Sequence, residues 1–381
     1  NGYMIWMEDK NTNRISINYI NGTIDNIVDT AGRQYKLEYN SNGLLKSVTD
    51  IEQRKISYEY DSRNLLVKMI DANNQSLRYE YDSSKFLTNL VDGNGNEFLA
   101  LEYNHNLGAE QNKIKTVKDE AGQLWTYTYD ETNRRTTITS SKENSEQRKW
   151  TYEYDKAMYI TKIQDPEGRS EETSYWYSDE LNHFGDIKTS TDRNGNTILY
   201  DVDNRGNITG ITKPQQDGGL SKKQLFYDEK NNIVKEINEI GNKVFYIYDN
   251  QTKSLLLKEV KPLNGIDEYD DNNKNDGYKN KFVIKEYTYY TKADANQAFN
   301  CNVSGLLKEI TDAEGNKESY TYDKYGNIGT YKNKSGNITT YEYNKIGWKT
   351  KETSPNNEVT TWEYDRNGKM IRQSNPDGGV T

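Results

Sequence analysis

The sequence of 381 residues is poor in cysteine, histidine and long apolar runs, and each shortage excludes a class of protein. Its one cysteine, Cys301, excludes a framework of intramolecular disulfides. No run of about 18 apolar residues occurs, so no membrane-spanning segment is expected. The only histidines, His105 and His183, have neither the spacing nor the neighbours of a zinc site.

Charge and hydropathy narrow the class further. The 50 basic and 59 acidic residues are interspersed and give a net charge of −9, which disfavours nucleic acid as a partner. A hydrophobic content of 33% and a mean hydropathy of −1.09 are low for a globular core. The 32 tyrosines argue against disorder, because a tyrosine buries a large ring while its hydroxyl stays wet. The composition therefore predicts a thin, solvated sheet.

The sequence is rich in one motif, Tyr-x-Tyr-Asp, as in Tyr58-Glu59-Tyr60-Asp61. Its closing tyrosine recurs most often after 21 residues, and most other steps are 22 to 27 residues. A second signal, usually Asp-x-x-Gly, follows at mid-period. A fixed period predicts a repeat architecture. The predicted structural repeat positions are Tyr39, Tyr60, Asp61, Tyr81, Asp82, Tyr103, Tyr129, Asp130, Tyr154, Asp155, Tyr177, Tyr200, Asp201, Tyr227, Asp228, Tyr248, Asp249, Tyr289, Tyr322, Asp323, Tyr343, Tyr364 and Asp365.

Residue chemistry predicts two strands and two turns in each period. Tyr58 and Tyr60 point to one face of a strand and Glu59 to the other, the alternation of a half-buried strand. Pairs such as Asn42-Gly43 favour hairpin turns. Helical periodicity is nearly absent, apart from a turn or two over 293–299. We therefore expect an all-β fold, a repetitive antiparallel β-hairpin ribbon that forms a single array of about 14 repeats over residues 1–381.

The repeated Tyr-x-Tyr-Asp with Asp-x-x-Gly at mid-period resembles the YD repeat of the RHS-repeat superfamily. That superfamily includes bacterial RHS and wall-associated polymorphic toxins, the B and C components of insecticidal toxin complexes, and teneurins. The resemblance runs from about Tyr19 to the last residue. It implies a wide β-ribbon that spirals into a hollow shell, here a YD-repeat spiral sheet or partial β-shell, commonly around a C-terminal toxic domain.

Self-cleavage, which toxin relatives carry out with aspartates near Asp-Pro-x-Gly pairs, is not carried over to this chain. Asp165-Pro166-Glu167-Gly168 matches half of that pattern. It occupies an ordinary mid-period turn, however, and no paired copy follows at the right distance.

Two long steps indicate insertions in the array. We place them at about 262–281, between expected strands at 255–260 and 282–289, and at about 292–303. Long loops on a regular scaffold are usually functional or mobile. Because both ends of the sequence cut the repeat, we expect a fragment of a longer protein, with any secretion signal, anchor or toxin outside it.

The first insertion also carries a weak calcium candidate. Hard cations need oxygen ligands, and six Asp and Asn residues crowd this loop. The spacing departs from an EF-hand, because Asp276 stands where glycine is needed and no Glu occupies the twelfth place. The alternative is a solvated, mobile acidic tip. The candidate ligands are Asp267, Asp270, Asp271, Asn273, Asn275 and Asp276.

No catalytic or cofactor-binding residue is assigned. His183 as a base and Cys301 as a nucleophile both lack partners in the sequence. The repeated aspartate fits a turn cap better than a catalytic series. The tyrosine rows could form a carbohydrate platform, but packing between neighbouring strands explains them more simply.

Three functions remain open at this stage. The first is a non-catalytic scaffold, a shell segment of a secreted or cell-surface bacterial protein that encloses or presents a C-terminal toxin domain; its partners would be the remaining repeats and that domain. The second is an adhesion module that binds a glycan or a cell-surface receptor through the hairpin tips between residues 262 and 303. The third, an enzyme on a repeat scaffold, is disfavoured.

Overall fold

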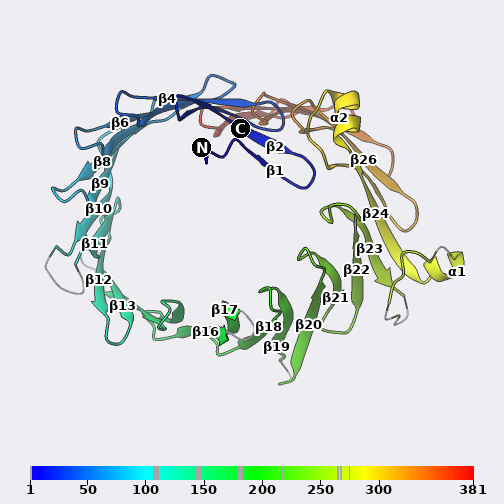
Figure 1. Ribbon diagram of the computed structural model, residues 1–381, viewed down its shortest axis with the longest axis horizontal. Coiled ribbons are helices and arrows are strands. Elements are labelled where there is room, and N and C mark those ends of the chain that lie inside the picture. The colour runs from blue at the N-terminus through cyan, green and yellow to red at the C-terminus, as the bar shows by residue number, and fades with distance from the viewer. Residues whose placement is uncertain are drawn as a thin grey trace. The chain divides into compact units, whose positions relative to one another are not determined.

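The computed structural model of the chain consists almost entirely of antiparallel β-strands, which confirms the predicted all-β fold (Figure 1). It describes residues 2–105, 111–141, 147–178, 183–216, 218–263, 266, 268–273 and 275–381. The contacts divide the chain into two compact units, Asn1–Ser76 with Phe245–Thr381, and Leu77–Val244. In each unit, strands that follow one another in the sequence pair side by side, as a meander requires.

The first unit contains two runs of strands. Its N-terminal run is β1 (Trp6–Glu8), β2 (Arg14–Ile20), β3 (Thr23–Val28), β4 (Gln34–Tyr39), β5 (Leu45–Thr49), β6 (Lys55–Tyr60) and β7 (Leu66–Ile70). Its C-terminal run is β22 (Lys243–Tyr248), β23 (Leu256–Pro262), β24 (Phe282–Tyr290), β25 (Leu306–Thr311), β26 (Lys317–Tyr322), β27 (Ile328–Lys332), β28 (Ile338–Tyr343), β29 (Lys349–Thr353), β30 (Val359–Tyr364) and β31 (Met370–Ser374).

The second unit is one continuous run. Its strands are β8 (Ser76–Tyr81), β9 (Leu87–Asp92), β10 (Glu97–Tyr103), β11 (Ile114–Asp119), β12 (Leu124–Asp130), β13 (Arg135–Ser141), β14 (Arg148–Tyr154), β15 (Ile160–Gln164), β16 (Ser170–Ser178), β17 (His183–Thr191), β18 (Thr197–Val202), β19 (Ile208–Pro214), β20 (Leu220–Tyr227) and β21 (Ile233–Ile237).

Both helices of the described chain lie in the expected insertions. The short α1 (Asp276–Lys279) lies between β23 and β24, which pair directly as predicted. The helix α2 (Lys292–Phe299) confirms the helical turns expected over 293–299. A capping box between Thr291 and Asp294 begins α2, and Asn300 ends it with a left-handed φ of 54°.

The same turn geometry recurs at both turns of the repeat, the one that follows the closing tyrosine and the one at mid-period. Asp92 illustrates it. The Asp92 N–H donates to the Asn96 carbonyl at 2.9 Å, and its carboxylate accepts the N–H groups of Asn94 and Asn96 at 2.9 and 2.8 Å. Gly95 has φ of 89°, the left-handed conformation that a three-residue hairpin loop needs at this place. The aspartate therefore satisfies backbone donors that the turn leaves unpaired.

The closing tyrosines tie neighbouring strands together through their hydroxyls. The Tyr60 hydroxyl donates to the Leu45 carbonyl at 2.8 Å, and Tyr322 donates to Leu307 at 2.7 Å, in each case 15 residues back. Burial raises the pKa of Tyr322 to about 12, so this hydroxyl stays protonated and keeps donating. The same bond recurs at Tyr19, Tyr129, Tyr175, Tyr227, Tyr289 and Tyr364.

The opposite face of the sheet carries charge pairs. Glu59 lies directly across from Lys68, and Glu342 across from Lys351 at 2.8 Å. Such exposed pairs contribute little to stability but keep this face soluble. Among the described residues few hydrophobic side chains are fully buried, and the largest buried cluster, around Val260, is local. The sheet is thin, as the composition predicted.

Two repeats differ from the predicted period. After β18 the strand ends at Val202 and the turn begins at Asp203, two residues later than the predicted Tyr200 and Asp201. The Asp203 carboxylate accepts the N–H groups of the turn, whereas Asp201 forms an ion pair with Lys222. The period failed here because the true closing residue, valine, is not aromatic.

The second difference concerns β16. There the hydroxyl–carbonyl bond is made by Tyr175, to the Ile160 carbonyl at 2.8 Å. The predicted Tyr177 instead donates to the Asp155 carboxylate, and the strand pairing is irregular on both sides of Tyr175. The motif alone could not distinguish two tyrosines that share one face.

Replacing Tyr60 with Phe removes one hydroxyl–carbonyl bond and little else. We expect a loss of about 1 kcal/mol in the free energy of unfolding. Tyr58→Phe is the matched control, since Tyr58 lies on the same strand and face but makes no such bond to the described residues. Urea unfolding of the whole chain measures both variants, and equal losses would contradict the role given to the Tyr60 hydroxyl.

Asp203→Ala tests the shifted turn. Because the Asp203 carboxylate accepts two turn N–H groups, its loss should cost about 1 kcal/mol. Asp201→Ala removes only an exposed ion pair and should cost less than about 0.5 kcal/mol. Thermal unfolding of both variants gives the order, and the reverse order would restore the period read from the sequence.

Candidate functional site

In the first unit, turns of the N-terminal run contact turns of the C-terminal run, and we call this contact the turn seam. At its best-defined point the Asn73 side chain donates to the Asp365 carboxylate at 2.9 Å. The same side chain accepts the Arg366 N–H at 2.9 Å. In the opposite direction, the Asn367 side-chain amide donates to the Asp71 carboxylate at 2.6 Å. Two Asp turns are thus joined reciprocally.

The neighbouring turn adds arginine to the seam. Arg54 donates to the Arg366 carbonyl at 3.2 Å, and Arg366 donates to the Gln53 carbonyl at 3.0 Å. The Arg54 guanidinium also lies over the Trp348 ring, 4.4 Å from its centroid. A guanidinium suits this place because it stacks on an aromatic ring while its planar donors reach carbonyl oxygens.

The seam continues along the N-terminal turns. The Lys345 N–H donates to the Glu52 carboxylate at 3.1 Å, and Asn13 exchanges two bonds with the Ser304 backbone at 2.8 and 3.1 Å. Asn11 and Arg33 contribute through contacts with Ser254 and Ile346. Because the contacts recur from turn to turn, the seam is a row and not an isolated bridge.

Local constraints hold the seam turns in shape. A Cβ on Gly368 would come within 2.6 Å of the Trp348 ring, and the φ of Gly368 is 92°, so only glycine fits there. Burial by itself would raise the pKa of Asp365. The amide of Asn73 and the N–H groups of the turn lower it instead, so the carboxylate remains ionised at neutral pH.

The first insertion packs onto the sheet, contrary to the expectation of a purely solvated tip. Tyr269 and Tyr278 both lie against Phe282, with ring centroids 5.0 Å apart in each pair. They join a small core built on Phe245 and Val260. The aromatic residues between the acidic ones are what the sequence interpretation overlooked.

Most of the described calcium candidates bond to other groups of the protein. The Lys258 ammonium lies 2.6 Å from the Asp271 carboxylate, which also accepts the Tyr269 hydroxyl at 3.0 Å. Asn275 caps α1. Asp270 and Asn273 accept N–H groups of their own turns, and Asp276 begins α1. Asp267 lies outside the described residues. No group of three metal-ligating side chains occurs in the described part of the chain.

The second insertion covers two tyrosines of the sheet. Phe299 of α2 packs edge-on against Tyr290 and Tyr322, with ring centroids 5.1 and 6.3 Å away. Cys301, which follows α2, is fully buried, and burial raises the pKa of its thiol. A buried thiol with a raised pKa is a poor nucleophile, which fits a packing role.

The histidines do not converge on a site. His105 lies 2.9 Å from the Asp82 carboxylate and beside the rings of Phe86 and Tyr103. His183 begins β17. No helix in the described chain has the length and apolar character that a membrane crossing needs.

Of the predicted positions, the structure brings Asp365 into the seam together with Asn73, Arg54 and Arg366, which the sequence interpretation did not single out. Their partners lie 292 to 313 residues away along the chain. No local motif carries that information. The only sequence signal is that Arg or Asn occupies turn positions where any polar residue would serve.

Comparison with known proteins gives a consistent family. The RHS Repeat family model matches residues 39–76, 60–97, 110–145 and 343–380. The chain is 27% identical over 231 residues to the tRNA3(Ser)-specific nuclease WapA of Bacillus spizizenii, and 25% identical over 223 residues to the tRNA nuclease WapA of Bacillus subtilis. Each match covers 57% of this chain and only 8% of the relative's length.

A solved structure shares the fold. The crystal structure of TcdB2-TccC3-Cdc42 superimposes with a TM-score of 0.50 at 11% sequence identity. The match covers 95% of this chain and 22% of that one. At this identity the likeness concerns the fold alone.

Asn73→Asp tests the turn seam, because it places a second carboxylate against Asp365 in place of an amide donor. We expect the turns at 71–75 and 365–369 to exchange their amide hydrogens faster, with about 1–3 kcal/mol lost locally. The loss should shrink at high salt.

Asn94→Asp is the control for this variant. Asn94 occupies the same place in its own turn, and its backbone N–H bonds Asp92, but it contributes to no seam. Hydrogen exchange that changes equally in both variants would show that the effect belongs to the turn and not to the seam.

Proposed function

The chain is a member of the RHS/YD-repeat superfamily, and from that premise we propose that it is a non-catalytic wall segment of an RHS-type shell. The shell would belong to a secreted or cell-surface bacterial protein and would enclose or present a C-terminal toxin domain. The partners of the segment would be the remaining repeats and that domain.

The turn seam is the observation that supports this proposal most directly. A wall made from one long strip needs contacts between stretches of the strip that are far apart in sequence, since neighbouring strands alone give only a ribbon. The seam joins turns about 292 residues apart through polar side chains and backbone groups. Such contacts close gaps between rims without a thick hydrophobic core.

The contacts of the turn aspartates and of the two insertions support a passive role, because both stabilise the sheet itself. Hydrogen bonds hold the turn aspartates to their own backbone, and the two insertions pack against the sheet. The nuclease activities in the names of the WapA relatives belong to those proteins, of which this chain matches 8% of the length. For the present protein, we assign catalysis to a domain other than this segment.

Limited proteolysis of the complete protein that carries this chain tests the proposal. We expect the toxin domain to be cleaved at least about tenfold more slowly within the complete protein than when expressed alone, because cleavage tracks the population of opened shell. Asn73→Asp in the complete protein should raise that cleavage rate, whereas Asn94→Asp should leave it unchanged.

Equal cleavage rates for the enclosed and the isolated domain would overturn the proposal. If the toxin domain is protected in the complete protein but Asn73→Asp does not raise its cleavage rate, the shell proposal stands and the turn seam has no part in closing the shell.

A further inference from the structure

A lysine and two carboxylates meet beneath the first insertion, within the first unit. The Lys258 Nζ lies 2.6 Å from the Asp271 carboxylate and 3.5 Å from the Glu286 carboxylate. Lys258 belongs to β23 and Glu286 to β24, and the two residues face each other across this strand pair. Asp271 belongs to the insertion, which folds back onto the same hairpin. One ammonium group is therefore shared by a cross-strand carboxylate and by a carboxylate that the insertion brings in.

The regular charge pairs of the sheet join two groups directly across the strands. The Lys351 Nζ, for example, lies 2.8 Å from the carboxylate of its cross-strand partner Glu342. At Lys258 the carboxylate of the insertion is closer than the cross-strand one, at 2.6 Å against 3.5 Å. The usual partner, Glu286, thus becomes a third group beside an ion pair, where it can exchange a proton with that pair.

The three groups lie at the edge of the small core under the insertion. Val260, on the same face of β23 as Lys258, is fully buried, and Phe282 is nearly so. Tyr269 covers Phe282, and its hydroxyl donates to the Asp271 carboxylate at 3.0 Å. The Lys258 side chain is only 22% exposed. Partial burial makes charge separation more costly than at the surface, which favours a neutral amine and a neutral acid relative to the ion pair.

Two pKa shifts describe the pair before any reaction. Burial by itself would lower the pKa of Lys258, but the hydrogen bond and charge of Asp271, together with those of Glu286, raise it. Burial raises the pKa of Tyr269, and the Asp271 carboxylate raises it further, so this hydroxyl remains a donor. The resting state is accordingly an ion pair with one proton to share between nitrogen and oxygen.

We propose that Lys258 and Asp271 form an intramolecular amide cross-link, an isopeptide bond, with Glu286 as the proton acceptor. A proton shift within the ion pair gives a neutral amine and a neutral carboxylic acid. The Lys258 Nζ then attacks the Asp271 Cγ, while Glu286 takes a proton from the nitrogen and passes it to the hydroxyl that leaves as water. One ammonium and one carboxylate become one amide and one water, and no oxidant or other reactant is consumed.

Proximity is what makes this condensation feasible. Free amines and carboxylates do not condense in water, but groups held about 3–3.5 Å apart in a fixed geometry react as if they were extremely concentrated. A nitrogen 2.6 Å from a carboxylate oxygen lies close to the carbon that bears it. The Tyr269 hydroxyl donates to that same oxygen, Oδ1 of Asp271, and stabilises the negative charge that develops on it.

The amide would tie the insertion to the strand that precedes it. Lys258 and Asp271 are 13 residues apart, so the bond closes a short loop in a chain whose single cysteine allows no internal disulfide. Such a cross-link restricts the unfolded chain as a disulfide does. Because the reaction occurs once in each molecule, it goes beyond the wall function without conflicting with it. It uses none of the seam residues, so either proposal can fail alone.

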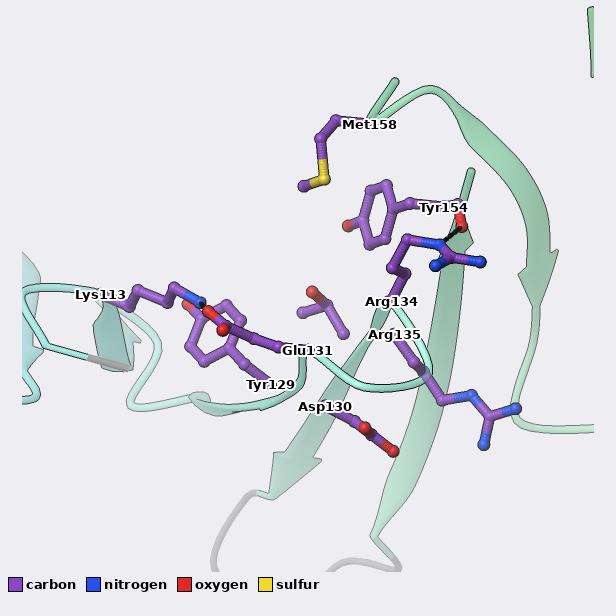
Figure 2. A pocket seen from close by; sticks show the side chains of 9 residues that line it. Lys113, Tyr129, Asp130, Glu131, Arg134, Arg135, Tyr154 and Met158 are labelled. Atoms are coloured by element: carbon purple, nitrogen blue, oxygen red, sulfur yellow. Dashed lines mark hydrogen bonds and ion pairs between the residues drawn. The ribbon is translucent and has the colours of Figure 1, made fainter. Parts of the chain in front are cut away.

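An ordinary ion pair is the alternative, and Lys113 with Glu131 provides a matched example (Figure 2). The Lys113 Nζ lies 2.5 Å from the Glu131 carboxylate and 4.9 Å from the centroid of the Tyr129 ring. This pair stands beside an open hollow of about 500 Å³. Among the described residues no second carboxylate pairs with Lys113. It shares the short distance and the aromatic ring with the Lys258 site but not the third group, so it should stay an ion pair.

Mass spectrometry of the intact folded chain tests the cross-link. We expect a mass lower by one water than the sequence requires, and a branched tryptic peptide that joins Lys258 to Asp271. Lys258→Arg keeps the charge but should abolish the loss of water, because a guanidinium stays protonated. Glu286→Gln should slow the reaction at least about hundredfold, the usual contribution of a proton-transferring side chain. The same digest should contain Lys113 and Glu131 in separate, unlinked peptides.

Hydrogen exchange of 275–281 shows whether each variant keeps the insertion folded, and the parent chain decides the question if a variant does not. The unreduced mass after prolonged incubation of the folded parent would overturn the proposal. Loss of water without a branched peptide would overturn it too, because it would indicate a cyclic imide at an aspartate. A folded Glu286→Gln variant that reacts as fast as the parent would refute the role given to Glu286.

Discussion

The hydrogen bonds that side chains make to the backbone at the end of each hairpin are the interaction on which this structure depends. A sheet with few buried residues cannot be held by a hydrophobic core, so the groups left unpaired at every turn must be satisfied locally. The carboxylate of a turn aspartate accepts hydrogen bonds from the N–H groups of its turn, and a tyrosine hydroxyl donates to a carbonyl of the preceding hairpin. Because many repeats supply both, the strip can be extended without a larger core.

This local closure also explains where variation is tolerated. The insertion between β23 and β24 lengthens a mid-period turn, yet Tyr289 still reaches the Leu256 carbonyl at 2.8 Å across it. The series of tyrosine hydroxyl–carbonyl bonds continues across the insertion because each bond depends on strand pairing and not on the length of the turn. New surfaces, such as the aromatic packing around Phe282, can therefore be added at the rim while the strip continues.

The two sites with a proposed role arise in opposite ways. The turn seam uses regular turns whose polar side chains meet partners far along the chain, as Asn73 meets Asp365. The site around Lys258 arises where the repeat is interrupted, since the insertion places Asp271 beside the cross-strand pair of Lys258 with Glu286. Departures from a locally consistent pattern are expected at functional sites, and this one brings three charged groups together.

The sequence alone determined the strands, the turn chemistry, the order of pairing and the family, because all of these rest on contacts within about one period. It placed Asp365 in a turn correctly, but it misplaced the turn after β18 because Val202 carries no aromatic signature. Only the tertiary structure decided that Asn73 and Asp365 meet and that Tyr269 covers Phe282. The contact of Asn73 with Asp365 depends on the summed twist of many strands, a quantity that no single repeat encodes. The contact of Tyr269 with Phe282 depends on how one insertion, outside the repeat pattern, folds onto its own hairpin.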